Sequence, residues 1–186
     1  RDAQESRGLG DVYKRQLEDC AKRCIGTRRE QVYRIDDVSS IIFRYESGAL
    51  TIEIPSGRKL FYPSARMGRR TIEGVNGSFE VENISYMGQD QTSGKWVRLN
   101  TYGGKLTENV VQAIARDLLA NAIFKVFDLG FNIVLHVHDE IAAEIPKDGN
   151  EEKTLQIMSE AMCSAPSWAT VSYTHLRAHE TPEHLV

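Results

Sequence analysis

A polar triplet between two short apolar runs is the part of this chain best suited to hold a metal ion. His138, Asp139 and Glu140 separate the runs 132–137 and 141–145, which together are rich in isoleucine and valine. Such runs on both sides of a tight polar centre predict a β-hairpin with the triplet at its tip. We expect buried neighbours to hold the backbone there while a carboxylate faces solvent, an arrangement that suits a metal-binding acid.

The same residues leave two other interpretations open. His136 and His138 are expected to project from one strand face and, with Asp139, could supply three ligands to the zinc ion of a metal-dependent hydrolase. The pattern is not HExxH, however, and two histidines separated by one residue are not a specific zinc signature. The polar residues could also simply fill a turn.

A helix is predicted ahead of this hairpin. Thr107 is a plausible N-cap, and Gly130 follows the expected last residue, 129. Apolar residues at three- and four-residue spacing predict a buried stripe: Val110, Val111, Ile114, Leu118, Ala122, Ile123, Val126 and Phe127. Glu108, Gln112 and Arg116 form a second row, which by itself is typical of a solvated face. Another helix is predicted from 151 to about 163.

The first half of the chain predicts a β-meander. Short β-rich runs at 41–47, 49–55 and 58–63 are separated by glycine-containing turns, and weaker strands are expected near 80–87 and at 95–100. The segment from 58 to 70 is basic, which indicates either a solvated strand edge or a phosphate-contacting surface. Its cations are Arg58, Lys59, Arg66, Arg69 and Arg70. A non-catalytic nucleic-acid-binding module built on these arginines is therefore another alternative.

Composition sets loose bounds on the rest. The 186 residues are 41% hydrophobic and 26% charged, as expected for one globular domain or a large piece of one. The net charge of −3 gives no global argument for nucleic acid. No run is long and apolar enough to span a bilayer and no secretory signal is visible, so we expect a cytoplasmic protein. Cys20, Cys24 and Cys163 fit neither a disulfide framework nor a complete zinc site, which favours reduced thiols.

Both ends of the chain differ from its middle. The phrases SRGLGDVYKRQ and VSYTHLRAHET resemble translated sequencing-adapter DNA. Residues 1–16, expected to be a loose leader, and residues 170–186 are therefore predicted not to be native. Three of the five histidines lie in the tail, so only His136 and His138 enter the functional argument.

The middle of the chain, 17–169, resembles a known family. TYGGKLTENVVQAIARDLL, then VLHVHDEIAAEIP and finally MCSAPSWA are similar, in that order, to the C-terminal polymerase region of family A DNA polymerases, bacteriophage and prophage branch. LTIEIPSGRKLFYP and ISYMG resemble the segment that this branch carries before its last palm elements. The resemblance implies the end of a fingers helix and a β-meander insertion over 17–100, and the C-terminal part of the palm over 101–169. The expected fold class is α+β, with an antiparallel palm-type sheet that includes the hairpin and packs on helices.

The resemblance also implies roles for the residues of the turn. A DNA-directed DNA polymerase transfers nucleotides with two Mg²⁺ ions about 4 Å apart. Asp139 would be the motif C carboxylate that binds catalytic magnesium, since hard magnesium prefers oxygen ligands. His138 would contact the primer terminus, and Glu140 would be an auxiliary acid near the metal ions.

Further roles fall on the helix before the turn. Gln112 matches the glutamine that reads the duplex minor groove. Much of the family has asparagine four residues before it, where this chain has Glu108 with Asn109 beside it. Asn109 is therefore an expected DNA contact, and Arg116 and Lys105 are expected phosphate contacts.

The chain also departs from the family pattern. Neither a DYSQIE-like motif with the first palm aspartate nor the nucleotide-gripping fingers helix is present. We therefore expect a fragment that is inactive alone. Its intact form is expected to be a monomer that binds primer–template DNA and deoxynucleoside triphosphates and does not associate with a membrane.

Overall fold

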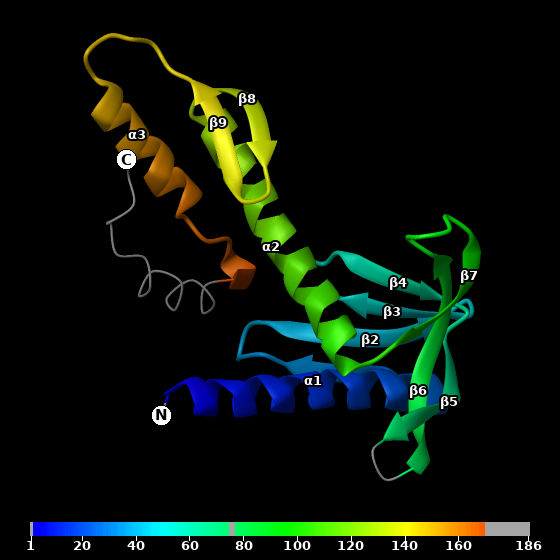
Figure 1. Cartoon of the computed structure of the whole chain (residues 1–186). Helices are drawn as coiled ribbons and strands as arrows, with labels where there is room; N and C mark the ends of the chain where they lie inside the picture. The colour runs from blue at the N-terminus through cyan, green and yellow to red at the C-terminus, as the bar shows by residue number, and fades with distance from the viewer. Residues whose placement is uncertain (1, 75–76, 170–186) are drawn as a thin grey trace. The chain divides into compact units, whose positions relative to one another are not determined.

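The computed structural model describes residues 2–74 and 77–169 (Figure 1). Within these ranges the chain is α+β, as predicted, with antiparallel strands only. The elements in chain order are α1 (Asp2–Thr27), β1 (Gln31–Arg34), β2 (Ser40–Glu46), β3 (Ala49–Glu53), β4 (Lys59–Pro63), β5 (Arg66–Gly74), β6 (Gly77–Gln89), β7 (Trp96–Thr101), α2 (Gly103–Asp128), β8 (Asn132–Val137), β9 (Glu140–Glu144), α3 (Glu151–Met162) and a 3-10 turn (Ser167–Ala169).

The chain forms two compact units, Arg1–Gln112 and Ala113–Val186. Helix α2 is continuous across their boundary. The division into 17–100 and 101–169 that the family resemblance implies stays a prediction.

The predicted meander is confirmed as β2, β3 and β4 of the first unit, and β1, which was not predicted, pairs with β2 to complete the sheet β1-β2-β3-β4. Alternate side chains point to opposite faces, so one face collects Phe43, Leu50, Ile52 and Tyr62, all buried. Helix α1 packs on β1, β2 and β3 and adds a buried stripe at helical spacing: Leu17, Ala21, Cys24 and Ile25. This layer of helix on sheet is the core of the first unit.

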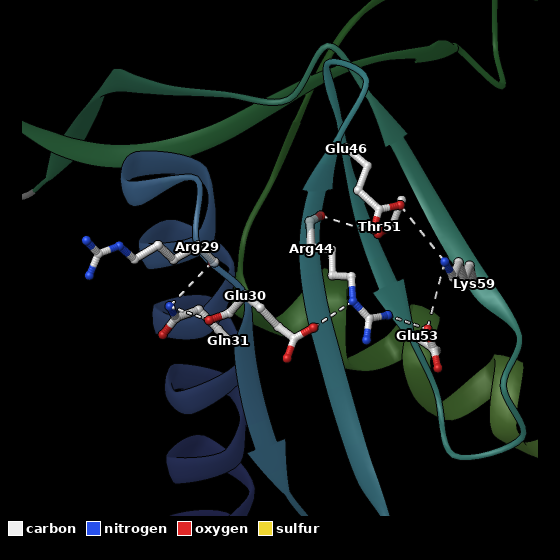
Figure 2. Close-up of polar contacts among 8 residues, drawn as sticks. All are labelled: Arg29, Glu30, Gln31, Arg44, Glu46, Thr51, Glu53 and Lys59. Atoms are coloured by element: carbon white, nitrogen blue, oxygen red, sulfur yellow. Dashed lines mark hydrogen bonds and ion pairs between the residues drawn. The ribbon is translucent and has the colours of Figure 1, made fainter.

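The opposite face of the same sheet carries oppositely charged side chains on neighbouring strands (Figure 2). The guanidinium of Arg44 lies between two carboxylates, 2.7 Å from Glu30 and 2.5 Å from Glu53. The ammonium of Lys59 is 3.9 Å from the carboxylates of Glu46 and Glu53. Hydrogen bonds to Glu53 and Glu30 raise the pKa of Arg44. This face of the sheet is therefore a network of paired charges.

The predicted weak strands belong to a second sheet, β5-β6-β7. Strand β6 is longer than the sequence indicates, because it pairs with β5 along one edge and with β7 along the other. Tyr86 of β6 meets Tyr62 of β4 edge to face, with ring centroids 5.0 Å apart. This aromatic pair joins the two sheets of the first unit.

Helix α1 corrects the expectation of a loose leader over 1–16. One helix runs from Asp2 to Thr27. It ends because Arg28 adopts a left-handed backbone with φ of 58°, and the Arg28 N–H donates to the carbonyl oxygen of Cys24 at 2.9 Å. The guanidinium of Arg28 lies 3.5 Å from the centre of the Tyr45 ring, a cation–π contact that offsets the backbone strain. The adapter-like origin of 1–16 stays a prediction.

The three cysteines are free thiols with different exposure. Cys24 is buried in the stripe of α1 that packs on the sheet, Cys20 is half-buried and Cys163 is exposed. Burial raises the pKa of Cys24 to about 11. Since the thiolate is the reactive form, we expect a thiol reagent such as DTNB at pH 8 to modify Cys24 at least about 100-fold more slowly than Cys163. The urea-unfolded chain, in which all three thiols are exposed, is the control, and equal rates in the folded chain would contradict the packing of α1.

The second unit contains the end of α2, the hairpin β8-β9 and α3, whose predicted position is confirmed. Within the described ranges the hairpin is a two-stranded sheet of its own. Its assignment to a palm-type sheet stays a prediction. The expectation that buried neighbours hold the turn is wrong, because Val134, Leu135 and Val137 are 56%, 57% and 45% exposed. A two-stranded hairpin has no second layer of its own that could cover these side chains.

Helix α2 begins earlier than predicted. The N–H of Gly103 donates to the carboxylate of Glu18 at 2.8 Å, so the cap comes from α1 rather than from Thr107. Thr107 lies inside the helix, where its hydroxyl donates to the carbonyl oxygen of Gly103 at 2.8 Å. The end is close to the predicted one, since Gly130 with φ of 87° follows the last turn.

The predicted apolar stripe of α2 is only partly buried. Val110, Ala122 and Val126 are buried, whereas Val111 and Phe127 are exposed. The stripe is wider than the neighbouring elements of either unit can cover, so residues at its margins remain in contact with solvent.

Candidate functional site

The hairpin turn places the predicted metal-binding carboxylate in solvent. Val137 pairs with Glu140, which leaves His138 and Asp139 as a two-residue turn. His138 adopts φ of 52°, a left-handed conformation in which histidine is enriched several-fold among non-glycine residues. His138, Asp139 and Glu140 are all exposed. The carboxylate of Asp139 therefore lies at the tip of two paired strands, where a ligand in solution can reach it.

The geometry of the turn separates the two histidines. His136 lies in β8 opposite Ile141, whereas His138 has left the strand. The expectation that both project from one strand face is therefore wrong. Within 2–74 and 77–169, no three His, Cys, Asp or Glu side chains are gathered closely enough to hold a metal ion. The zinc alternative thus lacks its ligand set, and Asp139 fits a magnesium site only as one member of an incomplete set of oxygen ligands.

The predicted polar row of α2 is confirmed as an exposed face. Glu108, Gln112 and Arg116 are all exposed. One carboxylate oxygen of Glu108 lies 3.3 Å from the ammonium of Lys105, and the other accepts a hydrogen bond from Nε2 of Gln112 at 3.3 Å. One side of the helix thus carries Lys105, Glu108, Gln112 and Arg116. Glu108 contacts both Lys105 and Gln112.

Asn109 has a different environment. It is half-buried, and its Nδ2 donates to the hydroxyl of Tyr62 at 3.0 Å. Burial raises the pKa of Tyr62, which therefore remains protonated at neutral pH. The structure does not bring Asn109 together with Gln112 on the exposed face. Sequence reasoning missed the part played by Tyr62, although the alternation of KLFYP places it on the inner face of its strand.

Two cations of the basic segment 58–70, Lys59 and Arg69, lie close to acids. Besides the contacts of Lys59 with Glu46 and Glu53, Arg69 lies 3.4 Å from Glu80 on the paired strand. The side chain of Arg70 lies outside the described part of the chain. These pairings favour the interpretation of a solvated sheet surface over a phosphate-contacting one.

Gln112 is the last residue of the first unit, and Asp139 belongs to the second. A single site that contains both residues therefore stays a prediction. None of the described helices combines the length and hydropathy needed to cross a membrane.

The chain is similar to a protein named DNA polymerase from Bacillus phage SP02. The two are 43% identical over 130 residues, which make up 69% of this chain and 18% of the phage protein. This chain therefore spans less than a fifth of the length of that relative. No family model and no solved structure matches the chain.

Proposed function

We propose that this chain is a segment of a DNA-directed DNA polymerase of family A, from the C-terminal part of its palm. The observation that carries the proposal is the 43% identity to the phage SP02 protein named DNA polymerase. The hairpin supports it, because its turn presents an exposed carboxylate on two paired strands. Primer–template DNA and deoxynucleoside triphosphates are the proposed ligands of the intact enzyme, which we expect to be a monomer.

Asp139 is the proposed metal ligand of the turn. Two Mg²⁺ ions, when bound, activate the primer hydroxyl and neutralise charge on the triphosphate. The exposed carboxylate of Asp139 would be one ligand of these metal ions, and Glu140 would be an auxiliary acid at the start of the next strand. The left-handed backbone at His138 turns that residue out of the strand, where its ring could contact the primer terminus.

The exposed row of α2 is the proposed DNA contact. Nε2 of Gln112 would donate to purine N3 and pyrimidine O2, acceptors that every base pair shows in the minor groove. Arg116 and Lys105 would lie near backbone phosphates. Asn109 stays a predicted DNA contact. It would have to bind DNA while its Nδ2 also donates a hydrogen bond to the hydroxyl of Tyr62.

We also propose that the chain alone does not catalyse transfer. Its described residues gather no complete ligand set for a metal ion. The apolar side chains of β8 are exposed, as expected of strands that a larger sheet covers in the intact protein. The relative is several times longer than this chain, so the segment proposed here would be a small part of the intact enzyme.

A primer-extension assay with Mg²⁺ and all four nucleotides tests the proposal. We expect no extension by the 186-residue chain. A chimera in which the matching segment of the phage SP02 polymerase is replaced by that of this chain should extend the primer. Robust extension by the chain alone would contradict its inactivity, whereas a folded chimera without activity would contradict the polymerase assignment.

A further inference from the structure

Glu108 uses both of its carboxylate oxygens on the exposed side of α2. Oε2 lies 3.3 Å from Nζ of Lys105, and Oε1 accepts from Nε2 of Gln112 at 3.3 Å. An ionised carboxylate only accepts hydrogen bonds, so the amide of Gln112 must turn its nitrogen and not its oxygen toward Glu108. The orientation of the Gln112 amide is therefore defined by chemistry as well as by geometry.

The turns of α2 that carry this row are firmly held on their other side. Leu106 and Val110 are buried, and the Asn109 amide is bonded to Tyr62 at 3.0 Å. The first amide of the helix is bonded to Glu18. On a helix that is packed in this way, side chains can be oriented for a ligand before it binds, because the packing fixes their backbone.

We propose that Glu108 is a positioning residue that presets Gln112 for reading the minor groove of a DNA duplex. This inference rests on the proposed function and deepens it. The amide nitrogen of Gln112 has two hydrogens: one is used by Glu108, and the other remains to donate to purine N3 or pyrimidine O2. If Glu108 were absent, the amide could rotate and present its oxygen, which repels these acceptors.

Lys105 completes the arrangement. A carboxylate close to DNA would be repelled by the phosphates, and the repulsion falls when a cation lies beside it. The ammonium of Lys105 lies within 3.3 Å of Glu108 and supplies this cation. Lys105 therefore acts mainly by neutralising Glu108, and its phosphate contact is secondary.

The chain contains a matched control for this pair. On α3, Nε2 of Gln156 donates to Oε1 of Glu160 at 3.0 Å, with the same four-residue separation. Pairs of this kind occur on many solvated helices. Glu160→Ala should release Gln156 and leave Gln112 unchanged.

The first measurement is the ordering of the Gln112 side chain in the free chain, from ¹⁵N relaxation of its amide group by NMR. Glu108→Ala should lower the order parameter of Gln112 but not that of Gln156, and Glu108→Gln, which keeps an acceptor oxygen, should retain most of the order. An order parameter of Gln112 that does not change in Glu108→Ala overturns the inference, whether or not the chain binds DNA.

The second measurement is duplex binding by fluorescence anisotropy, with normal purines and with 3-deazapurines that lack the N3 acceptor. The unmodified chain should bind the 3-deaza duplex roughly 3- to 10-fold more weakly, the effect of one lost hydrogen bond. Glu108→Ala should reduce this penalty to less than about twofold, whereas Glu160→Ala should keep it.

The outcomes separate the two proposals. A full 3-deaza penalty in Glu108→Ala overturns the role of Glu108 and leaves the proposed function intact. No penalty in the unmodified chain, or no duplex binding at all, counts against minor-groove reading by Gln112 and thus against that part of the proposed function.

Discussion

Replacing Asp139 by asparagine in the active chimera with the phage SP02 polymerase is expected to lower the rate of nucleotide incorporation on the order of 10³-fold. Asparagine keeps the size of the side chain but not its negative charge, and a divalent cation at the proposed site is held by charge. A loss of this size corresponds to about 4 kcal/mol of transition-state stabilisation. Single-turnover incorporation measured over a range of Mg²⁺ concentrations checks it.

Asp148→Asn is the matched control for Asp139→Asn. Asp148 lies in the turn before α3, and its carboxylate accepts a hydrogen bond from the N–H of Asn150 at 3.0 Å. An amide oxygen can accept the same bond, so we expect incorporation to change less than about twofold. If Asp139→Asn were as active as Asp148→Asn, Asp139 would not be a ligand of the catalytic metal ions.

Gly103→Ala should strongly destabilise the first unit. A Cβ atom at this position would overlap the carbonyl oxygen of Lys14 and come within 2.8 Å of the carboxylate of Glu18. The carbonyl belongs to the backbone of α1, so the clash is relieved only by moving one helix away from the other. We expect a loss of about 3 kcal/mol in the free energy of unfolding, measured by urea denaturation followed by circular dichroism.

Gly26→Ala is the control for this substitution. Gly26 also lies in a helix, but a Cβ atom there would meet nothing within 4 Å. Alanine favours the helix over glycine, so stability should stay the same or rise by up to about 1 kcal/mol. Equal effects of the two substitutions would mean that the close approach of α1 to Gly103 is absent in solution.

Local patterns predicted the elements well. The alternation in β2, β3 and β4 and the runs on both sides of His138 identify strands, because a strand has a side-chain period of two. The spacing of Glu108, Gln112 and Arg116 identifies one exposed side of a helix for a similar reason.

Features that depend on distant parts of the chain could not be predicted in this way. The cap of α2 comes from Glu18, which is 85 residues away from Gly103, and no local signal indicates it. The hydrogen bond from Asn109 to Tyr62 likewise joins a helix to a strand that was predicted separately. The exposure of Val134 and Phe127 has the same origin, since an apolar pattern shows which side chains favour burial but not whether a covering layer exists.

The position of Asp139 also depends on an irregularity in β8. The pairing shifts between Ile133 and Leu135, so Val134 is an extra residue in this strand. If the pairing continued regularly from Ile133 and Ala143, His136 would lie opposite Glu140 and Val137 would be drawn into the loop. The bulge at Val134 therefore keeps Val137 paired with Glu140 and leaves His138 and Asp139 as the two residues of the turn. A substitution in β8 that abolished the bulge, with the number of residues unchanged, would displace the carboxylate even if every polar residue were kept.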